Sequence, residues 1–331
     1  MSTTKGTTMH LTVFASALLF TLGFVAEVHA AVIAQTAQVE TLSQTYRGSQ
    51  CDNLEYQKIS PIKLFDNLYY VGPGYVSVWL IPTSAGLVLV DTTEEPYVDH
   101  VLNNIRKVGF TPADIKYILI THGHLDHFGG AARLQEMTGA RILATEEDWR
   151  MIEEAGNKPG RNGAPAPRVP KRDAVANDGD TLTLGSTTFK LYKTPGHTPG
   201  VLSAEFTVFD NGTPHKAFLW GGPGERPGLQ GAEQALATAN RLAQIPGIEV
   251  GVMVHSWLAP TYVYPNGNIF ERAQKLAQRR PGDPHAFIDP AAWTQFVKNT
   301  QEQTAKAVEM ERKAAAGSGA GDAAPAARPA R

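Results

Sequence analysis

Thr121-His122-Gly123-His124-Leu125-Asp126-His127 is the stretch that decides the fold, because it sets three imidazoles and a carboxylate directly after an apolar segment, Ile115 to Ile120. Alternate side chains of an extended segment point the same way, so His122 and His124 can face one ion. A turn at Asp126 and His127 would let these two side chains face a second point nearby. Zinc prefers nitrogen ligands with an occasional carboxylate, and it lowers the pKa of bound water to about 7. The stretch therefore predicts a site for one or two zinc ions that activates water.

Two further histidines are candidates for the same site. His197 lies in Thr194-Pro195-Gly196-His197-Thr198-Pro199-Gly200, where proline and glycine on both sides restrict the loop. His255 follows the apolar run from Val250 to Val254, at the place where a scaffold presents functional residues. The alternatives are a surface-loop histidine at 197 and a structural histidine at a strand end for 255. We expect His100, His215 and His285 at the surface.

The patterns along the chain predict an α/β protein with two mixed sheets. Short β-branched and aromatic runs separated by Gly, Pro, Asn and Asp predict a meander of strands between residues 63 and 90. Residues 96–108 have one apolar face and predict a helix, and residues 115–120 predict a buried strand. The second half repeats strands (181–191, 202–220) and then helix (232–243), with later helices expected at 269–278 and 291–312. Two such halves suggest two sheets packed face to face with helices outside.

Both ends of the chain are expected to lie outside this domain, which we place at residues 31–312. The apolar run from Leu11 to Ala26 is shorter than the about 20 residues of a membrane span, so residues 1–30 predict a signal peptide cut after Ala30. The protein would then be exported, to the periplasm or the medium. Residues 313–331 are rich in Ala, Gly and Pro and predict a disordered tail. The single cysteine, Cys51, cannot form an internal disulfide.

The ordered set of Asp91, the 122–127 stretch, His197 and His255 resembles the motifs of the metallo-β-lactamase superfamily, and most closely its third subclass. The resemblance implies a four-layer αβ/βα sandwich with two zinc ions per chain. It implies that His122, His124 and His197 bind the first zinc, and that Asp126, His127 and His255 bind the second. Asp126 would orient the attacking hydroxide, and Asp91 would fix the loop of Asp126 and His127 without binding metal.

One region departs from the family. Superfamily hydrolases place an Asp or Cys ligand between the last two metal histidines, and the lactamase subclass places a serine-containing stretch there that holds the substrate carboxylate. This chain has Trp220-Gly221-Gly222-Pro223-Gly224-Glu225-Arg226-Pro227-Gly228. Arg226, or the basic loop from Lys158 to Arg172, could replace the missing anchor, and solvated loop charge is the alternative for both.

The function expected from these features is hydrolysis of a cyclic amide or ester, with a β-lactam as the first candidate. The alternatives are a lactonase or other esterase of the same fold, a mononuclear iron dioxygenase, and a zinc-binding protein without catalysis. The net charge of -2 gives no reason to expect nucleic acid as a partner. We expect a small-molecule substrate and no membrane contact after removal of the signal.

Overall fold

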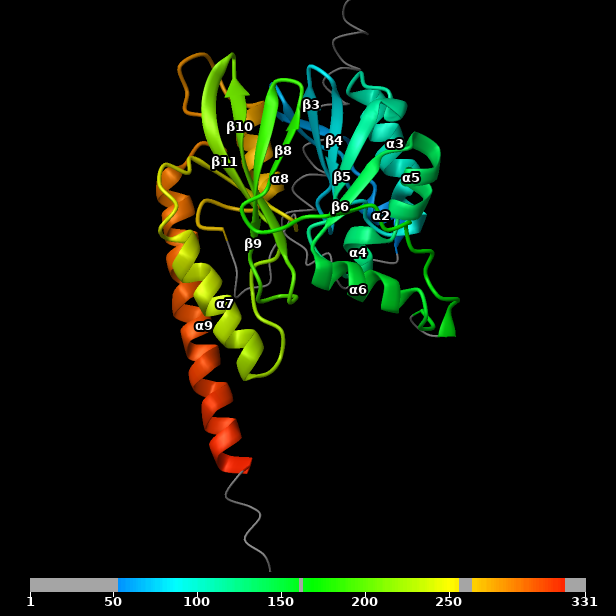
Figure 1. Ribbon diagram of the computed structural model, residues 1–331. Coiled ribbons are helices and arrows are strands. Elements are labelled where there is room, and N and C mark those ends of the chain that lie inside the picture. The colour runs from blue at the N-terminus through cyan, green and yellow to red at the C-terminus, as the bar shows by residue number, and fades with distance from the viewer. Residues whose placement is uncertain (1–52, 161–162, 256–263, 319–331) are drawn as a thin grey trace, which may run out of the picture.

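The computed structural model describes residues 53–160, 163–255 and 264–318, and these form two sheets with helices on their outer faces (Figure 1). The predicted signal peptide and Cys51 lie outside the described residues. Among the residues that are described, no helix is long and apolar enough to cross a membrane.

The first sheet has seven strands that follow one another in chain order. An antiparallel meander comes first, and it switches to parallel pairing after its fourth strand. The strands are β1 (Ile62–Phe65), β2 (Leu68–Tyr70), β3 (Trp79–Thr83), β4 (Gly86–Val90), β5 (Ile115–Leu119), β6 (Arg141–Ala144) and β7 (Ala174–Val175). Parallel pairing requires long crossover connections, and helices supply them between β4 and β5 and between β5 and β6.

The second sheet has five strands in the order β12-β11-β10-β9-β8. These are β8 (Thr181–Leu184), β9 (Thr187–Lys193), β10 (Leu202–Asp210), β11 (Thr213–Trp220) and β12 (Val250–Met253). The β10–β11 hairpin turns at Asn211-Gly212, where both residues have positive φ, as a two-residue type I′ turn requires. β12 pairs in parallel with β11, so this sheet is mixed as well. The prediction of two mixed sheets is confirmed.

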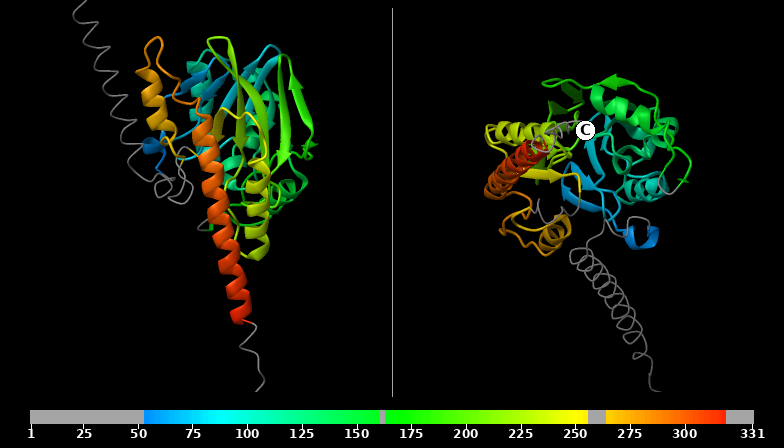
Figure 2. Two further views of the ribbon diagram at one scale, coloured as in Figure 1. Left: turned by 90° about the vertical axis from the view of Figure 1, so that its left-hand side faces the viewer. Right: turned by 90° about the horizontal axis from the view of Figure 1, so that it is seen from below.

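Helices cover the outer faces of both sheets, which confirms the sandwich (Figures 1 and 2). The first sheet carries α3 (Val98–Lys107), α5 (Ala131–Thr138) and α6 (Glu146–Ala155), and the second carries α7 (Leu229–Leu242) and α9 (Pro290–Ser318). The remaining helical elements are α2 (Leu54–Gln57), η2 (Glu95–Tyr97), η3 (Pro112–Asp114), α4 (Leu125–Phe128) and α8 (Ile269–Ala277). Phe270 of α8 packs edge-on against Tyr70 of β2, with ring centroids 5.7 Å apart.

Two layers of core lie on opposite faces of the first sheet because neighbouring strand residues point in opposite directions. In β4, Val88 and Val90 belong to the cluster between the sheets, which also contains Phe189 of the second sheet. Leu87 and Leu89 belong to the cluster under the helices. The strand is therefore buried on both faces, and the loop that follows it is anchored by a rigid support.

Two strands and part of the last helix differ from the sequence prediction. β6 and β7 were not predicted, because they are four and two residues long and pair only with strands distant in sequence. The boundary of the expected tail at residue 313 is wrong, because α9 continues to Ser318. Alanines 314–316 are strong helix formers, and Lys313 pairs with Glu309 one turn earlier at 2.6 Å.

His100 of α3, expected at the surface, is half-buried, and this burial is expected to make the stability of the protein depend on pH. Its Nε2 accepts hydrogen bonds from the Asn104 side chain at 3.0 Å and from the Ile59 backbone N–H at 3.4 Å. Burial, helped by the charge of Lys107, lowers the pKa of His100 to about 4.

The folded state therefore binds fewer protons at His100 than the unfolded state does between pH 6.5 and about 4. We expect the free energy of unfolding to fall as pH falls through this interval, and to fall less in His100→Gln, which keeps an acceptor. Urea unfolding of both metal-free proteins at pH 7 and pH 4 measures the difference. Parallel pH profiles would contradict this assignment.

Candidate metal centre

The loop that follows β5 carries four of the candidate ligands. β5 is held between β4 and β6, and the Thr121 carbonyl accepts from the Leu202 N–H of the second sheet at 2.7 Å. The loop therefore lies where the two sheets meet. It bends at residues 122–124, where the backbone of His124 is extended, and then enters α4, which contains Asp126 and His127.

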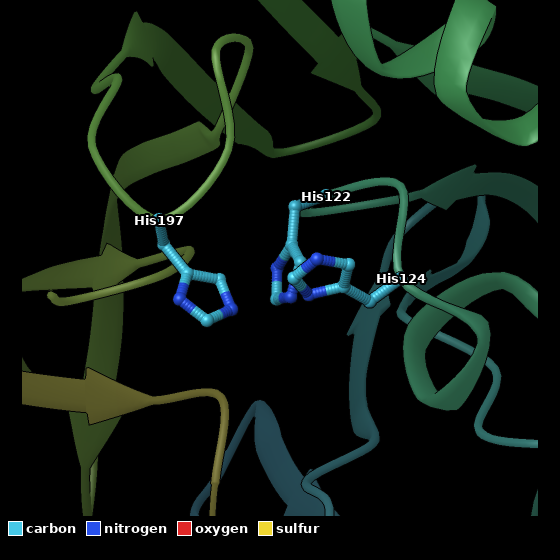
Figure 3. Close-up of side chains that lie close together, drawn as sticks. All are labelled: His122, His124 and His197. Atoms are coloured by element: carbon cyan, nitrogen blue, oxygen red, sulfur yellow. The ribbon is translucent and has the colours of Figure 1, made fainter. Parts of the chain in front are cut away.

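His122, His124 and His197 form the first group, here called the first triad. Each offers a ring nitrogen, and the three nitrogens lie within 4.8 Å of one another. His197 approaches from the loop after β9, opposite the other two rings (Figure 3). Its ring centroid lies 4.7 Å from that of His122 and 4.8 Å from that of His124. The structure thus brings together three residues that come from both halves of the chain.

Asp126, His127 and His255 form the second triad, and their ligand atoms also lie within 4.8 Å of one another. His255 follows β12, and its ring meets that of His127 edge-on at 5.1 Å. The rings of His122 and His127 are 3.8 Å apart between centroids, so the two triads are neighbours. All six side chains selected from the sequence therefore converge on one place.

The buried imidazoles present their Nε2 atoms as the metal-facing nitrogens. His122 Nδ1 donates to the Gly221 carbonyl at 2.9 Å, and His127 Nδ1 donates to Asp91 Oδ2 at 2.7 Å. The Nε2 atoms of His122 and His127 are buried without a hydrogen-bond partner. Buried nitrogens without a partner cost stability unless something else occupies their lone pairs. Metal-ligating histidines show this pattern, with one nitrogen fixed by an acceptor and the other directed at the ion.

The pKa values favour the neutral imidazoles that metal binding needs. Burial, followed by the neighbouring imidazoles, holds the pKa of His122 well below its ordinary value. Burial also lowers the pKa of His197 to about 3 and that of His255 to about 4. Protons therefore do not compete with a cation at these nitrogens near neutral pH.

Asp126 and His127 each shift the pKa of the other. Burial raises the pKa of Asp126, but His127, His255 and His124 lower it further, so the net shift is downward. Burial lowers the pKa of His127, and the carboxylates of Asp126 and Asp91 outweigh this effect and raise it. Asp126 is therefore a carboxylate at neutral pH, and a cation at the second triad would replace the proton that His127 attracts.

Asp91 fixes the segment of residues 121–127, which carries four of the candidate ligands. Its buried carboxylate accepts from the Thr121 N–H at 2.8 Å, the Thr121 hydroxyl at 2.7 Å and His127 Nδ1 at 2.7 Å. Asp91 and Thr93 both have positive φ, which is costly for residues other than glycine and is found at functional sites. Thr92, between them, binds the His127 carbonyl through its N–H and its hydroxyl.

We expect Asp91→Asn to weaken metal binding at the second triad by about 10–100-fold, the effect of losing an outer-shell partner. The amide places an N–H₂ group among three donors, so His127 loses the acceptor that orients it. Cobalt titration against a competing chelator measures the affinity. Asp210→Asn, which changes an aspartate that pairs with Arg279 at 2.9 Å, is the matched control. Equal affinity in Asp91→Asn and the native protein would show that His127 is oriented without Asp91.

The glycines after β11 leave the wall of the site without side chains. A Cβ at Gly221 would lie 1.9 Å from the Leu202 carbonyl oxygen, so only glycine fits there. A Cβ at Gly222 would lie 3.2 Å from the Cβ of His197. The backbone contributes to the site here, because the Gly221 carbonyl accepts a hydrogen bond from His122 Nδ1.

Both candidates for the missing substrate anchor have partners elsewhere among the described residues. Arg226 donates from Nη1 to the Gly196 carbonyl at 3.3 Å and from Nη2 to Gln230 at 3.3 Å. It therefore supports the His197 loop. In the basic loop, three side chains pair with glutamates of the helices nearby: Lys158 with Glu154, Arg168 with Glu136, and Arg172 with Glu146.

Sequence reasoning missed the groups that orient the ligands. His255 Nδ1 donates to the carbonyl of Tyr75 at 3.3 Å, in the loop between β2 and β3. Backbone carbonyls such as those of Tyr75 and Gly221 carry no signal in the residue type. Asp148 of α6 is a further buried acid near the site, and in the sequence it looks like an ordinary acidic residue in the first turn of a helix.

A site of five imidazoles and one carboxylate, set between two mixed sheets with helices outside, defines a class of metal-dependent hydrolases. A model of the metallo-beta-lactamase superfamily matches residues 71–207. BJP-1, a subclass B3 metallo-beta-lactamase of Bradyrhizobium japonicum, is 32% identical, with a TM-score of 0.65 over 78% of this chain and 97% of that one. The chain belongs to the metallo-beta-lactamase superfamily.

Three further comparisons define how far the likeness extends. The FEZ-1 metallo-beta-lactamase of Legionella gormanii shares the fold, with a TM-score of 0.68 at 24% identity over 77% of this chain and 98% of that one. A hydroxyacylglutathione hydrolase of Maricaulis maris is 32% identical over 36% of this chain and 38% of its own length. A probable metallo-hydrolase of Bacillus subtilis, YybB, is 31% identical over 38% of this chain and 54% of its own length. This chain thus covers about half or less of these curated relatives.

Proposed function

We propose that this hydrolase opens a cyclic amide or ester, with a β-lactam as the first candidate substrate. The observation that carries the proposal is the pair of neighbouring triads, each with its ligand atoms within 4.8 Å. The set contains no thiolate, as expected for the third subclass. The likeness to BJP-1 along 97% of that chain supports the same substrate class.

Zinc is the proposed metal, with two ions per chain. Imidazole nitrogen with one carboxylate oxygen is a ligand set that zinc accepts, and each triad offers three ligands, one fewer than the four of a closed zinc site. When bound, the metal would supply Lewis acidity, which makes water a stronger acid and polarises a carbonyl.

The side chains of this protein would then bind the metal, orient a water molecule and accept a proton. The hydrogen bonds from Nδ1 of His122 and His127 would keep their Nε2 atoms available as ligands for a bound metal. Asp126 Oδ2 lies 3.5 Å from His127 Nε2, and its carboxylate is anionic at neutral pH. This supports a role for Asp126 in orienting a water molecule and accepting its proton.

Hydrolysis of a neutral lactone or ester is the second candidate. The observation that favours it is the bare wall at Gly221 and Gly222, together with the pairing of Arg226 to the Gly196 loop. A β-lactam antibiotic carries a carboxylate that a hydrolase normally holds with a polar or cationic group. A substrate without that charge would not need such a group.

A hydrolysis screen of the metal-loaded protein with penicillins, carbapenems and lactones tests the proposal. We expect turnover of at least one penicillin or carbapenem, and faster turnover of a lactone would favour the second candidate. Hydrolysis of none of these substrates by protein that carries metal would contradict both.

We also propose that the protein is exported and that its mature part begins at Ala31. The apolar run of residues 11–26 followed by Val28-His29-Ala30 supports this. Sequencing the N-terminus of protein recovered from the periplasm or the medium tests it. Recovery of the uncut chain in the cytoplasm alone would contradict it.

A further inference from the structure

A buried carboxylate on α6 connects the two loops of the first triad. The Asp148 side chain is fully buried, although it lies in the first turn of a helix where acidic residues usually face water. Its Oδ2 accepts from the Thr198 hydroxyl at 3.0 Å, and Thr198 is also buried. Thr198 directly follows His197.

The same helix contacts the loop of the other two histidines. Burial raises the pKa of the Asp148 carboxyl to about 7. The backbone amide of Gly123 lies close enough to this carboxyl to offset part of that rise. Gly123 stands between His122 and His124. A Cβ at Gly123 would lie 2.7 Å from the Met151 Cβ and 3.1 Å from the Asp148 carbonyl oxygen, so the loop lies directly on α6.

The hydrogen bond between Thr198 and Asp148 crosses between the two halves of the protein. Other contacts hold the His197 loop to its own half: Thr238 of α7 donates to the Pro195 carbonyl at 2.7 Å, and the Arg226 N–H donates to the Gly196 carbonyl at 2.9 Å. Among the hydrogen bonds described for residues 195–200, that to Asp148 alone reaches an element of the first sheet's half.

The packing at this point is close as well. A Cβ at Gly200 would lie 2.1 Å from Thr145 Oγ1 and 3.0 Å from the Asp148 Cγ, so the His197 loop runs directly over the start of α6. Asp148 Oδ1 is buried and forms no well-aligned hydrogen bond, although the Gly123 amide lies near the carboxyl. Burying a carboxyl with so few hydrogen bonds costs stability, which suggests a role in the site.

We propose that Asp148 is a positioning residue, which sets the distance from His197 to His122 and His124 by holding Thr198 against the Gly123 loop. The proposal rests on the proposed function in one respect, because it assumes that the first triad binds metal. It predicts a larger effect on the first triad than on the second, because the hydrogen bond and close packing of Asp148 involve residues 123, 198 and 200, whereas its charge acts on His127 less than those of Asp126 and Asp91 do.

Cobalt titration against a chelator in two backgrounds tests the proposal. In His255→Ala the remaining strong site is the first triad, and in His197→Ala it is the second. We expect Asp148→Ala to weaken cobalt binding by about 10–100-fold in the first background and by a smaller factor in the second. Equal losses in both backgrounds, as general destabilisation would cause, would overturn the proposal, and so would no loss in either.

Thr198 provides a second test that leaves the helix untouched. Thr198→Val keeps the shape of the side chain and removes the donor, so it is expected to weaken the first triad as Asp148→Ala does. Thr198→Ser keeps the hydroxyl and is expected to retain the affinity. Glu147→Gln, which changes the neighbouring acid that pairs with Lys193, is the matched control on α6. Loss of affinity in the serine variant equal to that in the valine variant would overturn the proposal.

Different results would contradict the metal-dependent function and the role of Asp148. Native protein that binds no cobalt would overturn the metal-dependent function together with this proposal. Native protein that binds cobalt and hydrolyses substrate, with unaltered affinity in Asp148→Ala and Thr198→Val, would overturn the role of Asp148 alone.

Discussion

Replacing His122 with alanine is expected to abolish metal binding at the first triad and hydrolysis together. His122 is the fully buried member of that triad, and it is held by the Gly221 carbonyl at 2.9 Å. Its ring also packs against those of His124, His127 and His197. Losing this side chain removes a ligand and the support of its neighbours, so the loss of affinity should exceed the about 100-fold seen for outer-shell partners.

Metal analysis and steady-state kinetics on the same preparation measure this result. His215→Ala is the matched control, because His215 pairs with Glu249 at 3.1 Å and belongs to neither triad. Circular dichroism checks that both variants are folded. Full activity in folded His122→Ala protein would show that the reaction takes place elsewhere.

Replacing Asp126 with asparagine is expected to lower kcat by about 10²–10⁴-fold, the range of a general base. Asparagine keeps the shape and one possible ligand oxygen, but it cannot accept a proton. The carboxylate is partly exposed, with 24% of its side chain accessible, so it is reachable by water and substrate. The change should therefore act on kcat more than on the fold.

Kinetics with the best substrate of the screen measure kcat and KM separately for this variant. Asp99→Asn, which alters a surface carboxylate paired with Arg133 at 2.6 Å, is the control. An Asp126→Asn protein that keeps its metal and its kcat would exclude the carboxylate from the reaction. It would then favour a role for Asp126 in binding alone.

The position of the site could be predicted from the sequence because its signals are local. Four of the six side chains lie within residues 122–127, and the buried strand before them fixes where they emerge. His197 and His255 were recognisable from the restricted loop around the first and the strand before the second. What remained hidden were the acceptors for the imidazoles, because carbonyls such as those of Tyr75 and Gly221 depend on how distant segments meet.

The fold was predictable where a strand or helix is long and patterned. β4 and β10 have clear patterns, whereas β7 has two residues and no pattern of its own. His285 was expected at the surface because prolines and polar residues surround it in the sequence. It is buried, stacks on Phe65 at 4.3 Å, and donates to the Leu64 carbonyl at 3.0 Å. Tertiary packing of this kind outweighs local composition.

Counting the metal ions bound by the purified mature chain tests the central claim most directly. Cobalt titration of metal-free protein, followed by absorption and by metal analysis, should give two ions per chain in the native protein. It should give one in His197→Ala and one in His255→Ala, because each variant loses a different triad. Native protein without stoichiometric metal, or both variants with the full complement, would contradict the account.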